Sequence, residues 1–167
     1  MKAVMNGLKQ ADVQLNQVDV FSHGTTVATN ALIQRRFPPA ALITTKGFRD
    51  VLEIRDGTKD ELWDAYHDVP EPYIRRRDRY EVEERIDFDG AEVTPLDEAE
   101  ARRIAGILRR KKIETVAVCF INSHANASHE ERMAEILREE LPDAAISTSS
   151  EILPEIFEHD RFSTTVA

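Results

Sequence analysis

The segment Thr115–Ile121 (TVAVCFI) constrains the fold most, because it is apolar along its whole length. A strand covered on one face alternates between apolar and polar residues, whereas a fully apolar strand is typical of a sheet covered on both faces. Helical apolar spacing predicts one helix over residues 95–112 and another after Ser128. Two further apolar strands, Ala40–Thr44 and Ala144–Thr148, continue the alternation. The sequence therefore predicts an α/β fold with a parallel sheet.

Two helix starts carry capping patterns. Thr94 is followed by Pro95 and, three residues after the threonine, by Asp97. Threonine as the cap and proline in the first helical position are common at helix starts, so we expect the helix to begin at Pro95. Ser128 and Glu131 form a second capping box. The expected buried stripe of that second helix consists of Met133, Ile136, Leu137 and Leu141.

The rest of the chain repeats the alternation of helix and strand. Apolar spacing predicts a helix over residues 4–16, a short strand over 18–21 and a helix over 27–36. A short helix is expected over residues 47–54, and another over residues 152–159. These elements continue the predicted alternation of helices and strands toward both ends of the chain.

Residues 56–90 interrupt this regular pattern and hold most of the negative excess of the chain. The aromatic residues of this segment are Trp63, Tyr66, Tyr73 and Tyr80. Alternation over residues 79–86 predicts an edge strand, and Asp89-Gly90 predicts the turn after it. We interpret the segment as an irregular acidic insertion or a cover over one end of the sheet. It suggests a possible sub-boundary near 56–92 within a single region spanning 1–167.

The formal net charge of −9 is unevenly distributed over the 167 residues. Residues 1–57 carry a net charge of +2, residues 58–92 carry −6 and residues 93–167 carry −5. No nucleic-acid partner is expected, since contacts to phosphates require a basic face. The run Arg75–Arg77 lies among acidic residues, which predicts a solvated face with local ion pairs.

Cys119 is the only cysteine, so the chain forms no internal disulfide, which is typical of a cytoplasmic protein. Its position within the apolar strand predicts a buried and unreactive thiol. No apolar run approaches the roughly 20 residues that span a bilayer, so no membrane span is expected. The sequence stops at Ser163–Ala167 without a residue that closes an element, and we therefore expect a fragment of a longer protein.

The turn His23-Gly24-Thr25-Thr26 lies between a predicted strand and a predicted helix. Free backbone N–H groups there meet the positive end of the helix dipole. The glycine lets a ligand approach the backbone and the threonines add hydroxyl groups, so the turn suits a phosphate or another developing anion. The alternative is a threonine cap that happens to follow a histidine, and the spacing alone favours this alternative.

A second turn, Thr44-Thr45-Lys46-Gly47, follows the next predicted strand. It gathers hydroxyls, a cation and a glycine at the carboxyl end of a strand, where open α/β sheets place ligands. The alternative is a plain turn with a surface lysine and an ion pair between Arg49 and Asp50. The plain turn is favoured when it is taken alone, whereas two adjacent strand ends with the same chemistry support a binding role.

The spacing of the remaining histidines predicts no metal site. His124 and His129 lie on either side of Asn126, and no further ligands follow at a suitable spacing. We expect these two histidines in a surface loop and in the first turn of a helix. His67 and His159 have no assigned partners. The glycine-rich phosphate loops of common nucleotide-binding motifs are also absent from the sequence.

Two long stretches are more specific than any single motif: His23–Arg36 (HGTTVATNALIQRR) and Ala41–Ile54 (ALITTKGFRDVLEI). Shorter ones follow at Glu84–Asp87, Thr94–Glu98, Val116–Phe120, His129–Glu130, Ile136–Leu141 and Ser149–Glu155. In this order they resemble the N-terminal region of the hydantoinase A/oxoprolinase family over nearly the whole chain. The resemblance favours the binding role of the first turn over the plain cap.

The resemblance implies a ribonuclease-H-like subdomain of the actin-like ATPase superfamily, with a mixed sheet and flanking helices. It implies an enzyme that uses ATP and Mg²⁺ to phosphorylate a carbonyl or enol oxygen. Such an enzyme either hydrolyses cyclic amides such as hydantoin, oxoproline or a lactam, or belongs to a ketone carboxylase of the acetophenone type. A companion subunit similar to hydantoinase B and an oligomer are implied as well. The third hypothesis is that the chain is a non-catalytic assembly module.

The resemblance also implies roles for individual residues. His23, Thr25 and Thr26 are expected to be catalytic, and Gly24, Asn30, Thr44, Thr45 and Lys46 are expected to bind the nucleotide. Family members begin with a phosphate loop of the pattern G-x-D-x-G-G-T-x-T-D, which this sequence lacks. We therefore expect the chain alone to bind ATP weakly or not at all, and to be inactive. Residues 122–127 (NSHANA) depart from the family, where an aromatic residue and a proline are expected.

Overall fold

The computed structural model describes residues 7, 10–11, 24–57, 61, 63–67 and 70–167. The strand predicted over residues 18–21 lies outside this part, as does nearly all of the helix predicted over residues 4–16. The contacts divide the chain into two compact units, residues 1–34 and residues 35–167. The sheet lies wholly in the second unit.

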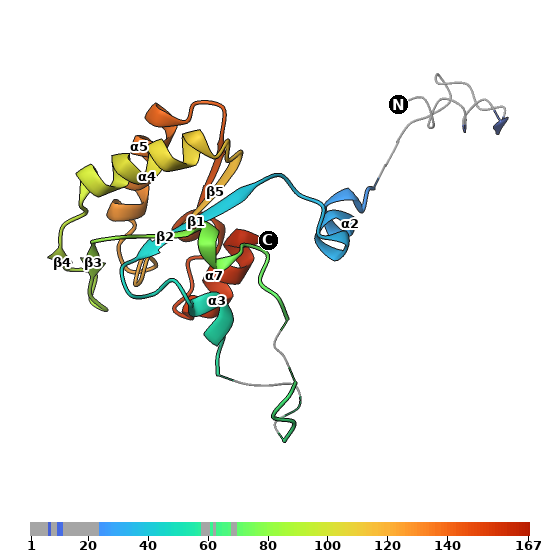
Figure 1. Ribbon diagram of the computed structural model, residues 1–167, viewed down its shortest axis with the longest axis horizontal. Helices are drawn as coiled ribbons and strands as arrows, with labels where there is room; N and C mark the ends of the chain where they lie inside the picture. Colours follow the sequence, from blue (N-terminus) through green and yellow to red (C-terminus); the bar gives the residue numbers. More distant parts are fainter. Residues whose placement is uncertain (1–6, 8–9, 12–23, 58–60, 62, 68–69) are drawn as a thin grey trace. The chain divides into compact units, whose positions relative to one another are not determined.

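Four parallel strands form the sheet of the second unit (Figure 1). In spatial order they are β2 (Arg79–Val82), β1 (Ala40–Thr45), β5 (Thr115–Cys119) and β6 (Ala145–Thr148). Leu42 lies opposite Ala117, and Val116 lies opposite Ile146. The predicted parallel strands are confirmed. The predicted mixed sheet is wrong for these four strands, because the antiparallel pairing in the described part of the chain belongs to a separate two-stranded sheet.

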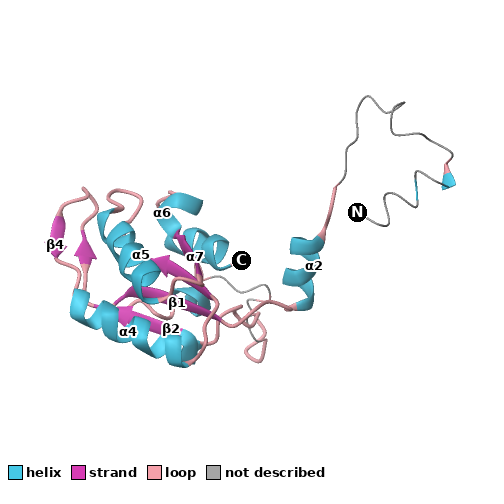
Figure 2. Ribbon diagram, turned by 90° about the horizontal axis from the view of Figure 1, so that it is seen from above, coloured by secondary structure: helices cyan, strands magenta, loops and turns pink. Residues whose placement is uncertain are grey.

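Helices cover both faces of this sheet (Figure 2). They are α4 (Glu98–Arg110) and α5 (Ser128–Glu140) on one face, and α3 (Val51–Ile54) and α7 (Glu158–Val166) on the other. Along β5, Val116 and Val118 belong to the first core, whereas Ala117 and Cys119 belong to the second. Because both faces of β5 are buried, its sequence is apolar without alternation.

The buried stripe predicted for α5 is confirmed. Met133, Ile136 and Leu137 are fully buried, and Leu141 nearly so. They pack against the apolar face of α4, where Ile104 is also buried. Full burial of one such side chain contributes about 1.5–3 kcal/mol, so this layer is a main source of stability.

Part of the segment predicted as an insertion joins the sheet. The predicted strand over residues 79–86 is two strands, β2 and β3 (Arg85–Ile86). A short helical turn, η2 (Arg76–Asp78), precedes β2, and β3 pairs with β4 (Glu92–Thr94) in an antiparallel hairpin. Gly90 has a φ of 84° in the connecting turn, which confirms the turn predicted at Asp89-Gly90.

The helix start predicted at Thr94-Pro95 is wrong, whereas the start predicted at Ser128 is confirmed to within one residue. Thr94 is paired within β4, so α4 begins only after Asp97. The Asp97 side chain accepts a hydrogen bond from the Glu100 N–H at 3.0 Å and takes the place of Thr94 as the cap. At α5, Asn126 Oδ1 accepts from the Ser128 N–H at 3.0 Å, so the capping oxygen comes from a residue before the predicted box.

The helix predicted over residues 152–159 is also wrong. α6 (Ser149–Ile152) ends where this helix was expected to begin, and α7 begins at Glu158. Pro154 lies between them and has no N–H group to donate within a helix. The link that results leaves Ile156 and Phe157 exposed.

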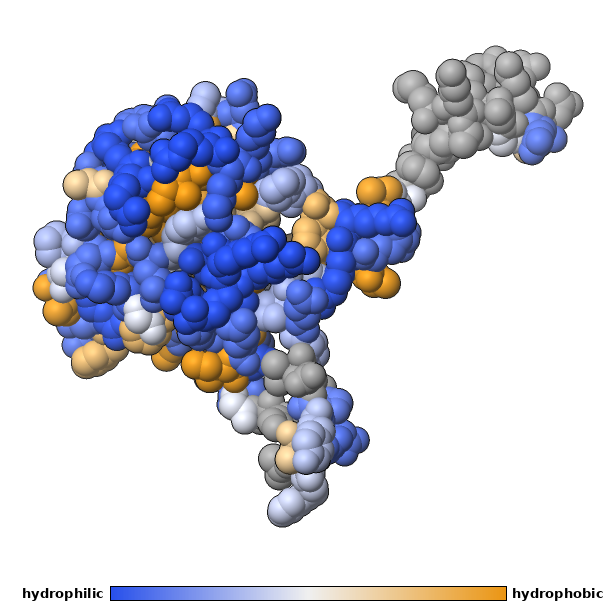
Figure 3. Space-filling model, viewed as in Figure 1, coloured by the Kyte–Doolittle hydropathy of each residue, from blue (hydrophilic) through white to orange (hydrophobic). Residues whose placement is uncertain are grey.

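α2 (Val27–Gln34) lies in the first unit and confirms the helix predicted over residues 27–36. None of its residues is buried. Figure 3 shows apolar surface on this helix, where Val27 and Ile33 are 70% and 75% exposed. The apolar residues of α2 are therefore not buried in a core within the described part of the first unit.

The basic run and the cysteine lie in the environments that were predicted for them. Arg76 Nε lies 2.7 Å from Asp50 Oδ1 on the surface, and Asp50 pairs with this arginine rather than with its neighbour Arg49. Cys119 is fully buried, and burial raises the pKa of its thiol well above the ordinary value. No helix in the described part of the chain is long and apolar enough to cross a bilayer.

Candidate functional site

Buried polar side chains gather where the parallel strands end. They are Thr45, Glu84, Ser123, His129, Glu130, Ser149 and Arg161. Open α/β sheets bind ligands at the carboxyl edge of their strands. Burial of so many polar groups is costly unless each is hydrogen-bonded. This edge is therefore the candidate functional site of the second unit.

Glu84 joins β1 to α5. One of its carboxylate oxygens accepts a hydrogen bond from the Thr45 hydroxyl, and the other lies 2.8 Å from Nδ1 of His129. The Thr45 oxygen in turn accepts from the Ile121 N–H at 3.0 Å. Nε2 of His129 lies 2.9 Å from a carboxylate oxygen of Glu92 in β4. One chain of contacts thus connects the ends of β1 and β5, the β3–β4 hairpin and the start of α5.

The His129 side chain lies between two carboxylates, those of Glu84 and Glu92. Each nitrogen faces a carboxylate oxygen, and a carboxylate only accepts hydrogen bonds. The Thr45 oxygen already accepts from the backbone, so its single hydrogen is given to Glu84. The Thr45 hydroxyl and the His129 ring thus give the buried Glu84 carboxylate two polar partners, as the burial of a charged group requires. The prediction that His129 lies in the first turn of a helix is confirmed, and the side chain is buried there.

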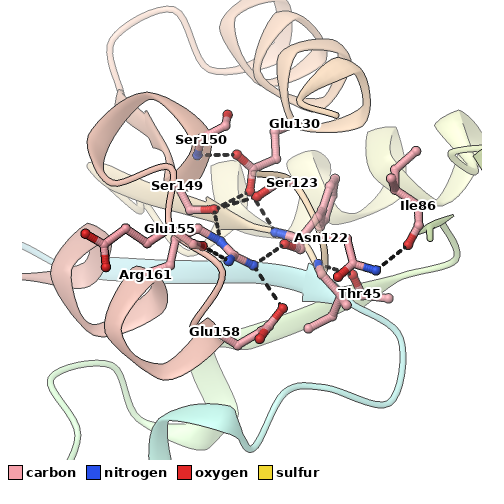
Figure 4. Close-up of polar contacts among 12 residues, drawn as sticks. Thr45, Ile86, Asn122, Ser123, Glu130, Ser149, Ser150, Glu155, Glu158 and Arg161 are labelled. Atoms are coloured by element: carbon pink, nitrogen blue, oxygen red, sulfur yellow. Dashed lines mark hydrogen bonds and ion pairs between the residues drawn. The ribbon is translucent and has the colours of Figure 1, made fainter. Parts of the chain in front are cut away.

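Glu130 holds the start of α6 against the end of β5 (Figure 4). Its Oε1 accepts from the Phe120 N–H at 2.8 Å and from the Ser149 hydroxyl at 2.6 Å. Its Oε2 accepts from the Ser150 N–H at 2.8 Å. Three donors compensate for the burial of this carboxylate.

Arg161 lies at the centre of the same group and is fully buried (Figure 4). Its guanidinium donates to the carbonyl oxygens of Glu155 at 2.6 Å and Phe120 at 3.0 Å, and to the Ser149 hydroxyl at 3.2 Å. A carboxylate oxygen of Glu158 lies 3.4 Å away. The arginine therefore fixes α7 and the link before it to the end of β5.

A pocket of about 750 Å³ lies between α3 and α7 at this edge. Its apolar lining consists of Phe48, Val51, Ile54, Ile121 and Phe157. Its charged lining consists of Arg55, Asp56, Glu158 and Asp160, and His159 also faces it. Three carboxylates against one guanidinium give a negative lining, which disfavours a free anion. The volume and the apolar walls are typical of sites for small neutral molecules.

Acidic residues already occupy the turn after β1. Lys46 pairs with Glu83, and the Gly47 N–H donates to Glu81 Oε1 at 2.8 Å. Gly47 has a φ of 89°, a conformation that favours glycine, and the helix expected from this residue begins only at Val51. An anion at this turn would have to displace two carboxylates.

Thr44 and Thr45 are both buried at the end of β1. Successive side chains of a strand point to opposite faces, so the two hydroxyls have different surroundings. The Thr45 hydroxyl is used within the fold, as described above. Thr44 Oγ1 has no hydrogen-bond partner within the described part of the chain.

The turn before α2 in the first unit is open. Thr25 Oγ1 accepts from the Val27 N–H at 3.3 Å, and Thr26 Oγ1 accepts from Nδ2 of Asn30 at 3.2 Å. A Cβ added to Gly24 would meet nothing within 4 Å among the described residues. The first N–H groups of a helix have no partner within the helix and are available to a ligand.

The predicted site residues are divided between the two units. Gly24, Thr25, Thr26 and Asn30 belong to the first unit, and Thr44, Thr45 and Lys46 belong to the second. His23 lies outside the described residues. The roles that the resemblance implies for these residues stay predictions. Within the part of the chain that is described, no group of three His, Cys, Asp or Glu side chains is arranged to hold a metal ion.

The sequence analysis missed Glu84, Glu130 and Arg161. For Glu130 a signal was present, because it precedes Met133 by three residues and Leu137 by seven. This spacing puts the carboxylate on the buried stripe of α5. For Glu84 no local signal exists, since Thr45 and His129 lie 39 and 45 residues away. Arg161 has local partners in Glu155 and Glu158, but its contact with Phe120 spans 41 residues of sequence.

Comparisons with known proteins support a single family. Residues 1–141 match the family model of the hydantoinase/oxoprolinase N-terminal region. The caprolactamase subunit alpha of Pseudomonas jessenii is 36% identical over 174 residues, which cover 98% of this chain and 25% of that protein. The acetophenone carboxylase gamma subunit of Aromatoleum aromaticum is 33% identical over 165 residues, which cover 91% of this chain and 22% of that protein.

A solved structure extends the similarity to the fold. The crystal structure of the ATP-dependent caprolactamase from Pseudomonas jessenii matches 98% of this chain and 25% of its own, with a TM-score of 0.87 and 36% identity. The chain thus spans about a quarter of the length of these relatives. It belongs to the hydantoinase/oxoprolinase N-terminal region family.

Proposed function

We propose that this chain is part of an ATP-dependent enzyme that hydrolyses a cyclic amide of the hydantoin, oxoproline or lactam type. The similarity to the ATP-dependent caprolactamase carries this proposal, because it includes 98% of the chain at a TM-score of 0.87. ATP with Mg²⁺ supplies a phosphoryl group that activates the amide carbonyl oxygen. The activity belongs to a longer protein, with an actin-like ATPase fold to which this chain contributes ribonuclease-H-like elements.

The turn before α2 is the part of the chain that we assign to the nucleotide phosphates. Gly24, Thr25 and Thr26 are exposed, and no described neighbour fills the space next to the glycine. Backbone N–H groups at the start of α2 and the two hydroxyl groups are suitable donors for a phosphate. Donors fixed before the reaction also stabilise the charge that develops during phosphoryl transfer.

The turn after β1 fits the nucleotide less well. Glu83 pairs with the Lys46 ammonium, and Glu81 accepts a hydrogen bond from the Gly47 N–H, so both donors already have acidic partners. We therefore assign Lys46 a role in holding β1 to the segment after β2. A direct contact between this lysine and phosphate would require that Glu83 leave it.

We assign the pocket between α3 and α7 to the cyclic amide. Apolar side chains such as Phe48 and Ile54 suit the methylene groups of a lactam ring, and the charged rim suits its polar amide group. The negative lining favours a neutral cyclic amide such as hydantoin or a lactam over oxoproline, whose carboxylate is anionic at neutral pH. The buried network around Arg161 keeps the α7 wall of this pocket in place.

A companion subunit similar to hydantoinase B is part of this proposal, as is an oligomeric assembly. The two relatives compared above are described as subunits of a caprolactamase and of an acetophenone carboxylase. The assay of this proposal therefore contains the complete protein together with the companion subunit.

A ketone carboxylase of the acetophenone type is the second candidate. The acetophenone carboxylase gamma subunit covers 91% of the chain at 33% identity, close to the value for caprolactamase. The apolar pocket also accepts an aromatic ketone. A third possibility is a non-catalytic assembly module that supports the active site of a partner.

Release of ADP by the complete protein and its companion subunit distinguishes these candidates. We expect stimulation by hydantoin, 5-oxoproline or caprolactam, together with the ring-opened product. Stimulation that requires acetophenone and bicarbonate would replace the proposal with the carboxylase. An intact complex that binds no nucleotide and turns over neither class of substrate would favour the assembly module.

A further inference from the structure

A second pocket lies at the opposite edge of the sheet, where the parallel strands begin. Its volume is about 700 Å³. It is lined by residues that directly precede β1, β2 and β5, among them Phe37, Tyr73 and Lys111. The buried networks and the pocket assigned to the amide lie at the carboxyl ends of the same strands, so the two pockets are separate.

This pocket is basic although the chain is acidic. Arg75, Arg77 and Lys111 contribute three positive charges and Asp78 contributes one negative charge, which leaves a net charge of +2 on the lining. The chain as a whole carries −9. A chain with this net charge does not need a positive pocket for its solubility. The charge of this pocket is also opposite to that of the pocket at the carboxyl edge.

Two of the cations have weak partners. Arg77 Nε lies 3.5 Å from Asp78 Oδ2, and Arg75 Nε lies 4.0 Å from Glu71 Oε1. Their side chains are 72% and 64% exposed. Lys111, in contrast, pairs with Asp78 at 3.0 Å. Exposed pairs at long distances contribute little, so both guanidinium groups can turn toward a bound anion at small cost.

An aromatic pair forms another wall of this pocket. The rings of Phe37 and Tyr73 meet edge to face, with their centroids 5.6 Å apart. The Arg35 guanidinium lies 5.0 Å from the centre of the Tyr73 ring, and it also donates to the Glu71 carbonyl at 2.6 Å. These contacts hold the tyrosine in place, while both rings stay partly exposed. A planar group that enters the pocket therefore finds a fixed aromatic surface.

We propose that this pocket binds a small organic anion in which a phosphate or carboxylate is attached to a planar ring. Arg75 and Arg77 bind the anionic group, since a guanidinium matches the two oxygens of either group. Phe37 and Tyr73 contact the ring. The volume lies within the range of sites for small molecules. The proposal does not depend on the cyclic-amide activity, because it concerns the other edge of the sheet.

Calorimetric titration of the 167-residue chain tests this site with three probes: phenyl phosphate, benzoate and inorganic phosphate. We expect at least one ring-bearing anion to bind tenfold or more tightly than inorganic phosphate. The tighter of phenyl phosphate and benzoate identifies the anionic group. Tyr73→Ala should weaken this binding and bring it close to that of inorganic phosphate.

The double variant Arg75→Ala/Arg77→Ala should weaken binding of the preferred probe at least tenfold. The matched control is Arg103→Ala/Arg138→Ala, which removes the same charge from exposed positions on α4 and α5. The control should bind like the unchanged chain, and thermal unfolding verifies that both double variants are folded. Absence of saturable binding, equal binding of inorganic phosphate, or equal weakening in the control would overturn the proposal.

Discussion

Nδ1 of His129 lies 2.8 Å from a carboxylate oxygen of Glu84, and both side chains are buried. The pair joins the first turn of α5 to the segment between β2 and β3. Glu84 also accepts the hydroxyl hydrogen of Thr45, so a single carboxylate connects three elements at the carboxyl edge of the sheet. Replacement of this carboxylate weakens the contacts to both His129 and Thr45.

Glu84→Gln should therefore lower the free energy of unfolding by about 2 kcal/mol, because a hydrogen bond to a buried carboxylate typically contributes about 1.5–3 kcal/mol. Urea denaturation followed by circular dichroism measures this loss. Glu83→Gln is the matched control, because Glu83 is adjacent, half-exposed and paired with Lys46 on the surface. An exposed pair contributes less than about 1 kcal/mol. Equal losses in the two variants would contradict the role given to Glu84.

Arg161→Met should lower the free energy of unfolding by about 3 kcal/mol, because it removes the guanidinium donors to the carbonyl oxygens of Phe120 and Glu155 and to the buried Ser149 hydroxyl. Amide hydrogen exchange should accelerate most in α7 and in the link before it. Arg138→Met, on the exposed surface of α5, is the control and should change stability by less than about 0.5 kcal/mol. Protection of α7 that survives the Arg161 change would show that other contacts hold this helix.

Thr25→Ala and Thr26→Ala, made in the complete enzyme, should each lower ATP turnover at least tenfold, because each removes a hydroxyl donor from the proposed phosphate site. Their thermal midpoints should change little, since both hydroxyls are exposed. Thr29→Ala lies on the same exposed helix and serves as the control. Full turnover in both variants would make this turn a simple helix cap.

Acid should destabilise the chain through three surface carboxyls. Hydrogen bonds from Arg76, Arg132 and Arg103 lower the pKa values of Asp50, Glu98 and Glu100, respectively. These carboxyls take up protons more readily in the unfolded chain, so their contribution is present near neutral pH. It is lost as the pH falls below the ordinary values of 3.8 for Asp and 4.5 for Glu.

Urea midpoints measured at pH 7, 4.5 and 3 follow this loss. In Arg132→Ala the contribution of Glu98 is already absent, so the difference from the unchanged chain should shrink as the pH falls. A high salt concentration should reduce the same difference at neutral pH, because it screens exposed charges. A difference that stays constant from pH 7 to pH 3 would argue against this ion pair.

Cys119 should react with iodoacetamide only when the fold opens. Burial raises the pKa of its thiol, and the thiolate is the reactive form. Mass spectrometry should show slow alkylation in native buffer and rapid alkylation in urea, with a rate that follows the opened population. Alkylation in native buffer at the rate of a free thiol would show that β5 is accessible.

The sequence alone predicted the layered α/β architecture because this depends on local patterns. β5 is recognisable from the six apolar residues in a row over Val116–Ile121, and the stripe of α5 from its 3.6-residue spacing. The helix start predicted at Thr94 is wrong for a physical reason. Thr94 has the features of a cap, but it belongs to β4 and pairs with Arg85 of β3. The next suitable acceptor, Asp97, therefore caps α4.

Tertiary structure decided which polar residues share a site. Glu84 and His129 are 45 residues apart, and Glu130 and Ser149 are 19 apart, distances over which no periodic pattern connects two side chains. They meet because parallel strands end at one edge of the sheet, where burial permits a charge only beside its partner. The sequence by itself determined the elements and the family resemblance. The folded sheet determined which charges are buried, which turn is already occupied by acidic residues, and that the two edges carry pockets of opposite charge.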